Sequence, residues 1–340
     1  MQRFDNSGDN SPTIHLAAAA KLYAAAERPP SNTHQVLITE AFIYQIAINS
    51  TFRPSCLSNY DDLSGIINVW LRSPALQRTA DNSPFTKAGL SSWLPIWTLN
   101  IIFKASYLLR YRNIVSSEDI QVKVHELQIQ LNDLQQAVSA SKCAYDVREK
   151  TCSEGLEKSG NSQAKSLPKC ESSPHISSSD EGFHMRELYS LAISLLLAKI
   201  ARPTITAETP TVTSISKTAL FHLRHVRSDI PCLLWAITVL ATAVNSMGDR
   251  FVISAHLEAM RHFAGERAIS SVLSFLSLAW GQSAACCLNW AMDNYSGDEF
   301  GISPVDSEQL STLVEEGSAW KRPLGLDILF EESLLELVIL

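Results

Sequence analysis

The stretch LLWAITVLATAVNSMGDR, residues 233–250, decides the fold class of this chain. Residues 233–246 carry no charge and are apolar almost all round, which predicts a helix buried inside a large protein. The longer uncharged run 230–248 approaches the roughly 20 residues of a membrane-spanning helix. It lacks a flanking basic cluster and contains polar or helix-ending residues: Pro231, Thr238, Thr242, Asn245 and Ser246. We therefore expect this helix to be buried in protein and not in lipid.

Helical patterns continue on both sides of this stretch. Apolar residues recur at spacings of three and four, prolines fall between the blocks or at their starts, and no sustained alternation of period two is present. Ser116 and Asp119 match the capping-box pattern at the start of one helix. The pattern predicts an all-α fold, a multi-helix bundle or superhelical domain with a disordered serine-rich insertion. The expected helices cover residues 13–27, 34–52, 61–71, 91–111, 118–140, 186–202, 211–227, 250–264 and 269–280.

The composition divides the chain into five parts. Residues 1–12 are polar and are expected to form a disordered N-terminus without an apolar signal sequence. Residues 153–182 are rich in serine and poor in apolar side chains, so they cannot bury enough surface to offset the entropy lost on ordering. We interpret this segment as a flexible linker between a first helical half, residues 13–152, and a second, residues 183–281. Residues 282–340 are interpreted as a poorly defined acidic tail.

The overall composition limits the classes of partner. The 340 residues are 46% hydrophobic and carry a net charge of −7. A surface dominated by phosphate contacts needs a basic balance, so we expect any contact with DNA to be indirect. The 7 cysteines are odd in number and show no zinc-site spacing, which favours buried free thiols in a reducing compartment.

Motifs typical of enzymes and of metal sites are missing from the sequence. It has no glycine-rich phosphate loop, no nucleophile elbow and no His-Glu-x-x-His pattern. His222 and His225 lie three apart on one expected helix and could share a metal, but without a clear carboxylate or thiol partner we favour exposed or capping histidines. The sequence therefore predicts binding and regulation, not catalysis, with no catalytic residue, no cofactor and no metal site.

Asp249 and Arg250 lie where the apolar helix ends and an amphipathic helix begins. Asp249 can cap the helix that starts at Arg250. The planar guanidinium of Arg250 can bind carbonyl oxygens or a carboxylate at this junction. We interpret the pair as a structural junction, with anchoring of a ligand as the alternative.

These segments together resemble the fungal-specific transcription factor domain, the regulatory domain of fungal zinc binuclear cluster transcription factors. That family shows a Trp-led apolar helix followed by an Asp-Arg pair, a later apolar helix that ends in Trp, and an earlier apolar helix that contains Tyr. The resemblance covers residues 36–280, with the order and spacing of the blocks preserved. The residues that carry its signature are Tyr189, Trp235, Asp249, Arg250 and Trp280.

The resemblance implies a regulatory domain, comparable to a middle homology region, that controls transcription by RNA polymerase II in the nucleus. Its implied partners are the transcription machinery, other regulators or a small-molecule effector. The six-cysteine zinc cluster of the family is not formed by the 7 cysteines here, so zinc is expected only if such a cluster precedes this chain. The chain could be a fragment, the product of a misjoined gene, or a regulator without its own DNA-binding region.

Two alternatives from other classes remain open. One is an α-helical small-molecule-binding protein or an enzyme of unknown reaction with a buried pocket. The other is a membrane-associated protein that uses residues 230–248. An enzyme would need titratable groups that converge in a cleft, and the most apolar expected helices offer almost none.

Overall fold

The computed structural model describes residues 16, 18–19, 21–23, 32–57, 60–72, 94–156, 178–281, 324–331 and 338, with the backbone alone for 33, 54–55, 137–156 and 178–180. Within these residues the regular structure is helical and no strand occurs, which confirms the prediction of an all-α fold. Residues 1–12, where a disordered N-terminus was expected, and most of the expected first helix lie outside the described residues.

The described chain contains nine α-helices and three short 3-10 helices, labelled η. In chain order they are α2 (Thr33–Phe52), η1 (Pro54–Leu57), α3 (Tyr60–Leu71), α5 (Ile96–Tyr111), α6 (Ser117–Leu156), α7 (Ser178–Ala201), α8 (Pro210–Leu223), η4 (Pro231–Leu233), α9 (Leu234–Ala241), α10 (Met247–Ala264), α11 (Glu266–Trp280) and η5 (Gly325–Phe330).

Side-chain caps fix where several helices begin. The Asn32 side chain accepts a hydrogen bond from the Gln35 amide at the start of α2 (2.9 Å). The Ser116 hydroxyl accepts from the Asp119 amide (3.1 Å) and donates to the Asp119 carboxylate (2.7 Å) before α6. These bonds satisfy amides that have no partner within a helix. The expected capping pair Ser116–Asp119 is therefore present.

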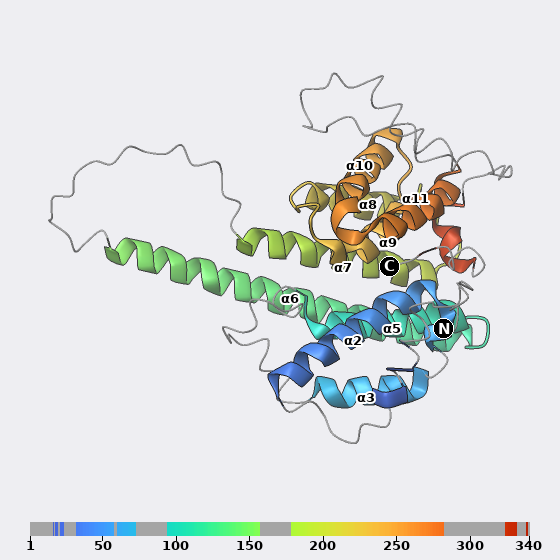
Figure 1. Cartoon of the computed structure of the whole chain (residues 1–340), viewed down its shortest axis with the longest axis horizontal. Helices are drawn as coiled ribbons and strands as arrows, with labels where there is room; N and C mark the ends of the chain where they lie inside the picture. Colours follow the sequence, from blue (N-terminus) through green and yellow to red (C-terminus); the bar gives the residue numbers. More distant parts are fainter. Residues whose placement is uncertain are drawn as a thin grey trace, which may run out of the picture.

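The helices pack in two groups with α7 between them (Figure 1). Helices α2, α3 and α5 lie on one side of α7, and α8 to α11 lie on the other. The first part of α6 packs against α5 and α7, with Val124, Leu127 and Leu131 buried. The rest of this 40-residue helix extends away from the body (Figure 1).

Both expected halves of the chain contribute to one hydrophobic core. Phe52, the last residue of α2, meets Phe275 of α11 edge to face, with ring centroids 5.8 Å apart. Helix α5 from the first half contacts α7 from the second. A core shared in this way means that neither half buries its apolar surface without the other.

Helices enter the expected linker from both sides. Helix α6 continues to Leu156 and α7 begins at Ser178, so residues 153–156 and 178–182 are helical. Both helices are longer than the sequence predicts, because the serine-rich composition of residues 153–182 indicated a flexible linker. Residues 157–177, the middle of the expected linker, lie outside the described residues.

The interpretation of residues 282–340 as a poorly defined tail does not hold for the segment that the structure describes there. Residues 324–331, here called the strap, contain η5 and place Leu326, Ile328 and Leu329 in the core. Val338 is also fully buried. The strap lies at one end of the molecule, beside α11 (Figure 1). The apolar residues of this acidic segment are thus part of the hydrophobic core.

Helix α9 is shorter than the sequence predicts. It ends at Ala241 instead of continuing to residue 246, and every residue from Leu234 to Ala241 is buried. Residues 242–244 turn with bonds between positions three apart, and α10 then starts at Met247. None of the helices in the described part of the chain combines the length and the apolar character needed to cross a membrane.

Candidate functional site

Trp235 of α9 lies at the centre of a buried chain of hydrogen bonds that joins the two helical groups. Its side chain is completely buried, and its indole N–H donates to Thr51 Oγ1 of α2 (3.0 Å). Thr51 Oγ1 lies 2.8 Å from Ser106 Oγ of α5. The Ser106 hydroxyl donates to the Ile102 carbonyl (2.8 Å). Its one proton is thereby used, so the Thr51 hydroxyl is the donor in the bond between them.

Two tyrosines bind the carbonyl just before α9. Tyr44 of α2 donates to the Cys232 carbonyl oxygen (3.0 Å), and Tyr189 of α7 donates to the same oxygen. The Tyr189 ring stacks on Trp235, with centroids 5.5 Å apart. Burial raises the pKa of both phenols, so each keeps its proton and acts as a donor. Burial also raises the pKa of the Cys232 thiol to about 12, which leaves it protonated and unreactive.

Arg110 connects this chain of bonds to the strap. The guanidinium donates to the Thr51 carbonyl through Nη2 and to the Leu329 carbonyl through Nη1 (2.9 Å). Continuous polar contacts therefore run from Trp235 through Thr51 and Arg110 to Leu329. We call this set, together with Tyr44, Ser106 and Tyr189, the helix junction.

Arg250 occupies a second buried position, where α9, α10 and α11 meet. Its Nε donates to the Val244 carbonyl (3.2 Å) and its Nη1 to the Trp280 carbonyl (3.3 Å). The guanidinium carbon lies 5.6 Å from the centre of the Trp280 ring. The Trp280 indole in turn donates to the Ala241 carbonyl (2.9 Å). Arg250 and Trp280 thus bind carbonyls at the end of α9, in the turn that follows it and at the end of α11.

Asp249 has a different position from the one expected. Helix α10 begins at Met247, and its cap is Ser246, whose hydroxyl accepts from the Asp249 amide (3.1 Å). The prediction that Asp249 caps a helix beginning at Arg250 is therefore wrong. Asp249 lies in the first turn, where its negative charge is favourable to the helix dipole. The structure places Arg250 in the junction role and Asp249 beside it.

Three histidines gather where the start of α7 meets the end of α8. His184 Nδ1 lies 2.8 Å from His222 Nδ1, and the His184 and His225 rings stack with centroids 4.7 Å apart. Burial, His184 and His225 together lower the pKa of His222 to about 4. His225 caps α8 by donating to the Phe221 carbonyl (2.7 Å). In the part of the chain that the structure describes, no group of three or more side chains is arranged to hold a metal ion.

Two internal cavities of the described chain are small. One, of about 20 Å³, lies between α5, α6 and α7 and is bordered by Arg186 and Glu187. The other, of about 10 Å³, has an almost entirely apolar lining from α7 to α10. A single water molecule needs about 10–15 Å³ measured in this way, and small-molecule sites are typically far larger. Neither cavity admits an organic ligand in this conformation.

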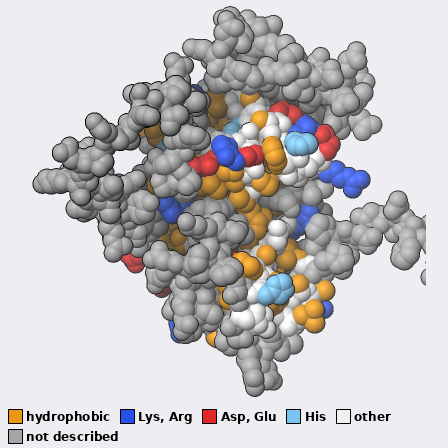
Figure 2. Space-filling model, turned by 60° about the vertical axis from the view of Figure 1, so that its left-hand side comes forward, with side chains coloured by type: hydrophobic (Ala, Val, Ile, Leu, Met, Phe, Trp, Pro, Cys, Tyr) orange, Lys and Arg blue, Asp and Glu red, His pale blue; other side chains and the backbone are white. Residues whose placement is uncertain are grey.

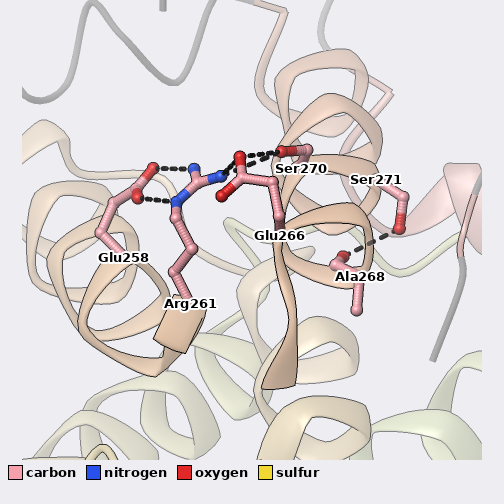
Figure 3. A network of polar contacts seen from close by, with 6 residues as sticks. All are labelled: Glu258, Arg261, Glu266, Ala268, Ser270 and Ser271. Carbon is pink, nitrogen blue, oxygen red and sulfur yellow. Dashed lines mark hydrogen bonds and ion pairs between the residues drawn. The ribbon is translucent and has the colours of Figure 1, made fainter. Parts of the chain in front are cut away.

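A third polar group lies between α10 and α11 and reaches the surface at Glu266 (Figure 3). Arg261 binds both carboxylate oxygens of Glu258 (2.6 and 2.7 Å), and also contacts Glu266 and the Ser270 hydroxyl (3.0 Å). It spans the turn at Gly265, whose φ of 93° favours glycine. We call this set the surface network. On the face in Figure 2, some acidic and basic side chains adjoin one another beside hydrophobic side chains.

The structure brings together four of the five signature residues as buried packing elements. Tyr189 and Trp235 belong to the helix junction, and Arg250 and Trp280 belong to the α9–α11 corner. Thr51, Ser106 and Arg110 were missed, because a single threonine, serine or arginine in an amphipathic helix carries no distinguishing signal. The only available signal was position: Thr51 and Arg110 each fall in the last turn of an expected helix.

Comparisons with known proteins do not extend this description. No family model, curated protein or solved structure matches the chain.

Proposed function

We propose that the chain is a regulatory domain of a fungal transcription factor, which acts in the nucleus by binding protein partners or an effector and has no catalytic role. The proposal starts from the resemblance of residues 36–280 to that family. It includes control of transcription by RNA polymerase II, and contact with DNA only through other proteins or a separate DNA-binding region.

The proposal is supported by the positions and hydrogen bonds of the signature residues in the structure. Tyr189, Trp235, Arg250 and Trp280 are buried, and each binds a backbone carbonyl or the Thr51 hydroxyl. They hold helix ends together, and none of them lines either of the two small cavities described above. A domain built around such a joint is suited to transmit the binding of a partner through the packing of its helices.

The alternative is a small-molecule-binding protein or an enzyme. It requires an internal site of at least about 300 Å³ for an ordinary ligand. The two cavities described above are more than tenfold smaller. This alternative therefore has less support than regulation through the protein surface.

The proposal is tested by tethering the whole chain to an unrelated DNA-binding domain in a fungal host. We expect expression of a reporter gene beneath the matching DNA site to change several-fold relative to the DNA-binding domain alone. We also expect the untethered chain, with a fluorescent tag, to accumulate in the nucleus. A stable, folded fusion that leaves the reporter unchanged would contradict the proposal.

The role of Arg250 is tested in the same assay, with thermal stability measured alongside. We expect Arg250→Ala to lower both the melting temperature and the reporter response, because it leaves the Val244 and Trp280 carbonyls without these donors. Arg250→Lys should restore little, since lysine lacks the planar fork. Arg267→Ala, at an exposed position of α11, is the control. A variant at Arg250 that keeps full stability but loses the response would instead indicate ligand or partner binding at this residue.

A further inference from the structure

The strap is held by charge and by apolar contacts together. Its Asp327 carboxylate lies 2.6 Å from the Lys199 ammonium, while Leu326, Ile328 and Leu329 are buried around this ion pair. The Asp327 side chain is 63% exposed, whereas Lys199 is 0% exposed. The strap thus pairs an exposed carboxylate with a buried ammonium.

Lys199 is a buried cation whose hydrogen bonds are completed by the strap. Its ammonium donates to the Pro203 carbonyl (2.6 Å), the Ile205 carbonyl (2.9 Å) and Asp327 (2.6 Å). An ammonium has three donors, so the body of the protein satisfies two and the strap satisfies the third. Without an acidic group here, the body would contain a buried cation with no counter-charge in this set of contacts, which is costly.

Two arginines from the end of α5 add to this surface. Arg110 donates to the Leu329 carbonyl (2.9 Å), and the Arg112 guanidinium carbon lies 3.5 Å from the centre of the Phe330 ring. The strap therefore meets a cation at its carboxylate, at a backbone carbonyl and at its aromatic ring. The body around the strap has the chemistry of a recognition site for a peptide that is acidic and apolar at once.

We propose that the surface formed by Arg110, Arg112, Lys199 and the adjoining face of α11 is a binding site for acidic, leucine-rich peptides, and that the strap is its built-in occupant. The site is called the strap site. The inference goes beyond the proposed function and rests on contacts alone. A partner protein that carries a segment with one carboxylate beside several aliphatic side chains would compete with the strap for this site.

Chain connectivity favours such an exchange. The strap follows α11 after residues 282–323, a length that leaves its position to be set by its own contacts and not by a short connection. The sequence that continues from the strap repeats the same chemistry, with Glu332 and Glu336 near leucines. Alternation of acidic and apolar residues is typical of segments that bind partners in extended or transiently helical form.

The site is tested with a fluorescent peptide of residues 324–340 and the full-length chain. In one form of the chain the strap is released by Asp327→Lys together with Leu329→Asp, which leave the body residues of the strap site unchanged. We expect the natural peptide to bind this form at least tenfold more tightly than the wild-type chain, where the strap competes. A peptide that carries Asp327→Lys should bind the released form at least tenfold more weakly than the natural peptide.

A second measurement covers the case in which the released form does not fold. The natural peptide is added in excess to the wild-type chain, and amide hydrogen exchange is followed by mass spectrometry. We expect exchange in residues 324–331 to become at least severalfold faster, while exchange in α5 and α7 stays the same. The proposal is overturned if exchange of the strap does not respond, or if a folded released form binds the natural peptide no better than the wild-type chain does.

Discussion

The centre of the helix junction is fully buried, whereas the surface network reaches solvent at Glu266. In the junction, Trp235 and Thr51 are buried and join helices far apart in the sequence. In the surface network, Arg261 joins neighbouring helices. Its partner Glu266 is 70% exposed, whereas Arg261 is 24% exposed and Glu258 is 7% exposed. Water can replace the partners of an exposed group, but a buried group that loses its partner bears the full cost of desolvation. The contribution of a region to stability therefore depends on how deeply its hydrogen bonds are buried and not on their number.

The largest effect is expected from Trp235→Ala. Removal of a fully buried Trp side chain leaves a cavity and typically costs about 3–5 kcal/mol of unfolding free energy. Urea unfolding followed by circular dichroism measures this loss. The control is Trp97→Ala in α5, where the side chain is 36% exposed. If both variants lose the same stability, burial does not separate the regions as we describe.

A smaller loss is expected from Thr51→Val, which keeps the shape of the side chain but removes its hydroxyl. The Trp235 indole N–H and the Ser106 hydroxyl then lose this partner in a buried site, at a cost of about 1–3 kcal/mol. The same unfolding experiment measures it. Thr218→Val is the matched control, because the Thr218 hydroxyl bonds within its own helix at an exposed position. Equal losses for the two variants would remove the distinction.

Protonation of buried histidines allows a further comparison, because it changes the charge of the side chain but not its shape. The pKa of buried His222 is lowered to about 4, below the value of about 6.5 for an unfolded histidine. The unfolded chain therefore takes up the proton first, and the stability that neutral His222 provides is complete above pH 6.5 and is lost as the pH falls toward 4. We expect this loss to be about 1–2 kcal/mol for His222. His256, whose pKa burial also lowers to about 4, adds a loss of the same sign.

The test is the unfolding free energy between pH 7 and pH 4.5. We expect His222→Asn to reduce the pH dependence, since asparagine does not titrate, and His262→Asn at an exposed position of α10 is the control. A wild-type chain whose stability stays constant over this range would show that His222 is accessible to protons in the folded state.

The smallest effect is expected from Glu266→Gln in the surface network. Exposed ion pairs contribute about 0–1 kcal/mol, and the Glu266 side chain, which pairs with Arg261, is 70% exposed. The loss should shrink further in 1 M salt, where charges are screened within about 3 Å. Unfolding at low and high salt measures both effects. A loss larger than that of Thr51→Val, independent of salt, would reverse the ranking of the two regions.

Sequence patterns were sufficient where a helix is determined by its own residues. Ser116 and Asp119 cap α6 as expected, and the apolar spacing identified α2 and α11 to within a few residues. The apolar run that begins at Leu233 was correctly expected to be buried. These features depend on neighbours three or four positions away, which a single sequence displays.

Features that depend on distant partners were not predictable. Helix α9 ends at Ala241 although the sequence remains apolar, and the distant Trp280 and Arg250 side chains bind the Ala241 and Val244 carbonyls there. The strap forms because Lys199, Arg110 and Arg112 meet it from other helices. The composition shows that this segment is acidic, but it does not show that the buried Lys199 ammonium is its partner. The signature residues could be selected from the sequence, whereas their junction partner Thr51 could not.

The hydrogen bond between Thr51 and Trp235 can form only after the long chain segment between them has been synthesised. The two residues are 184 positions apart in the chain. A ribosome adds about 5–20 residues each second, so Trp235 emerges about 10–40 seconds after Thr51 at that rate. At the end of this interval α2 to α8 have been made, but α10, α11 and the strap, which complete the shared core, have not. Nascent chains of this protein should therefore need protection by chaperones until α11 has left the ribosome.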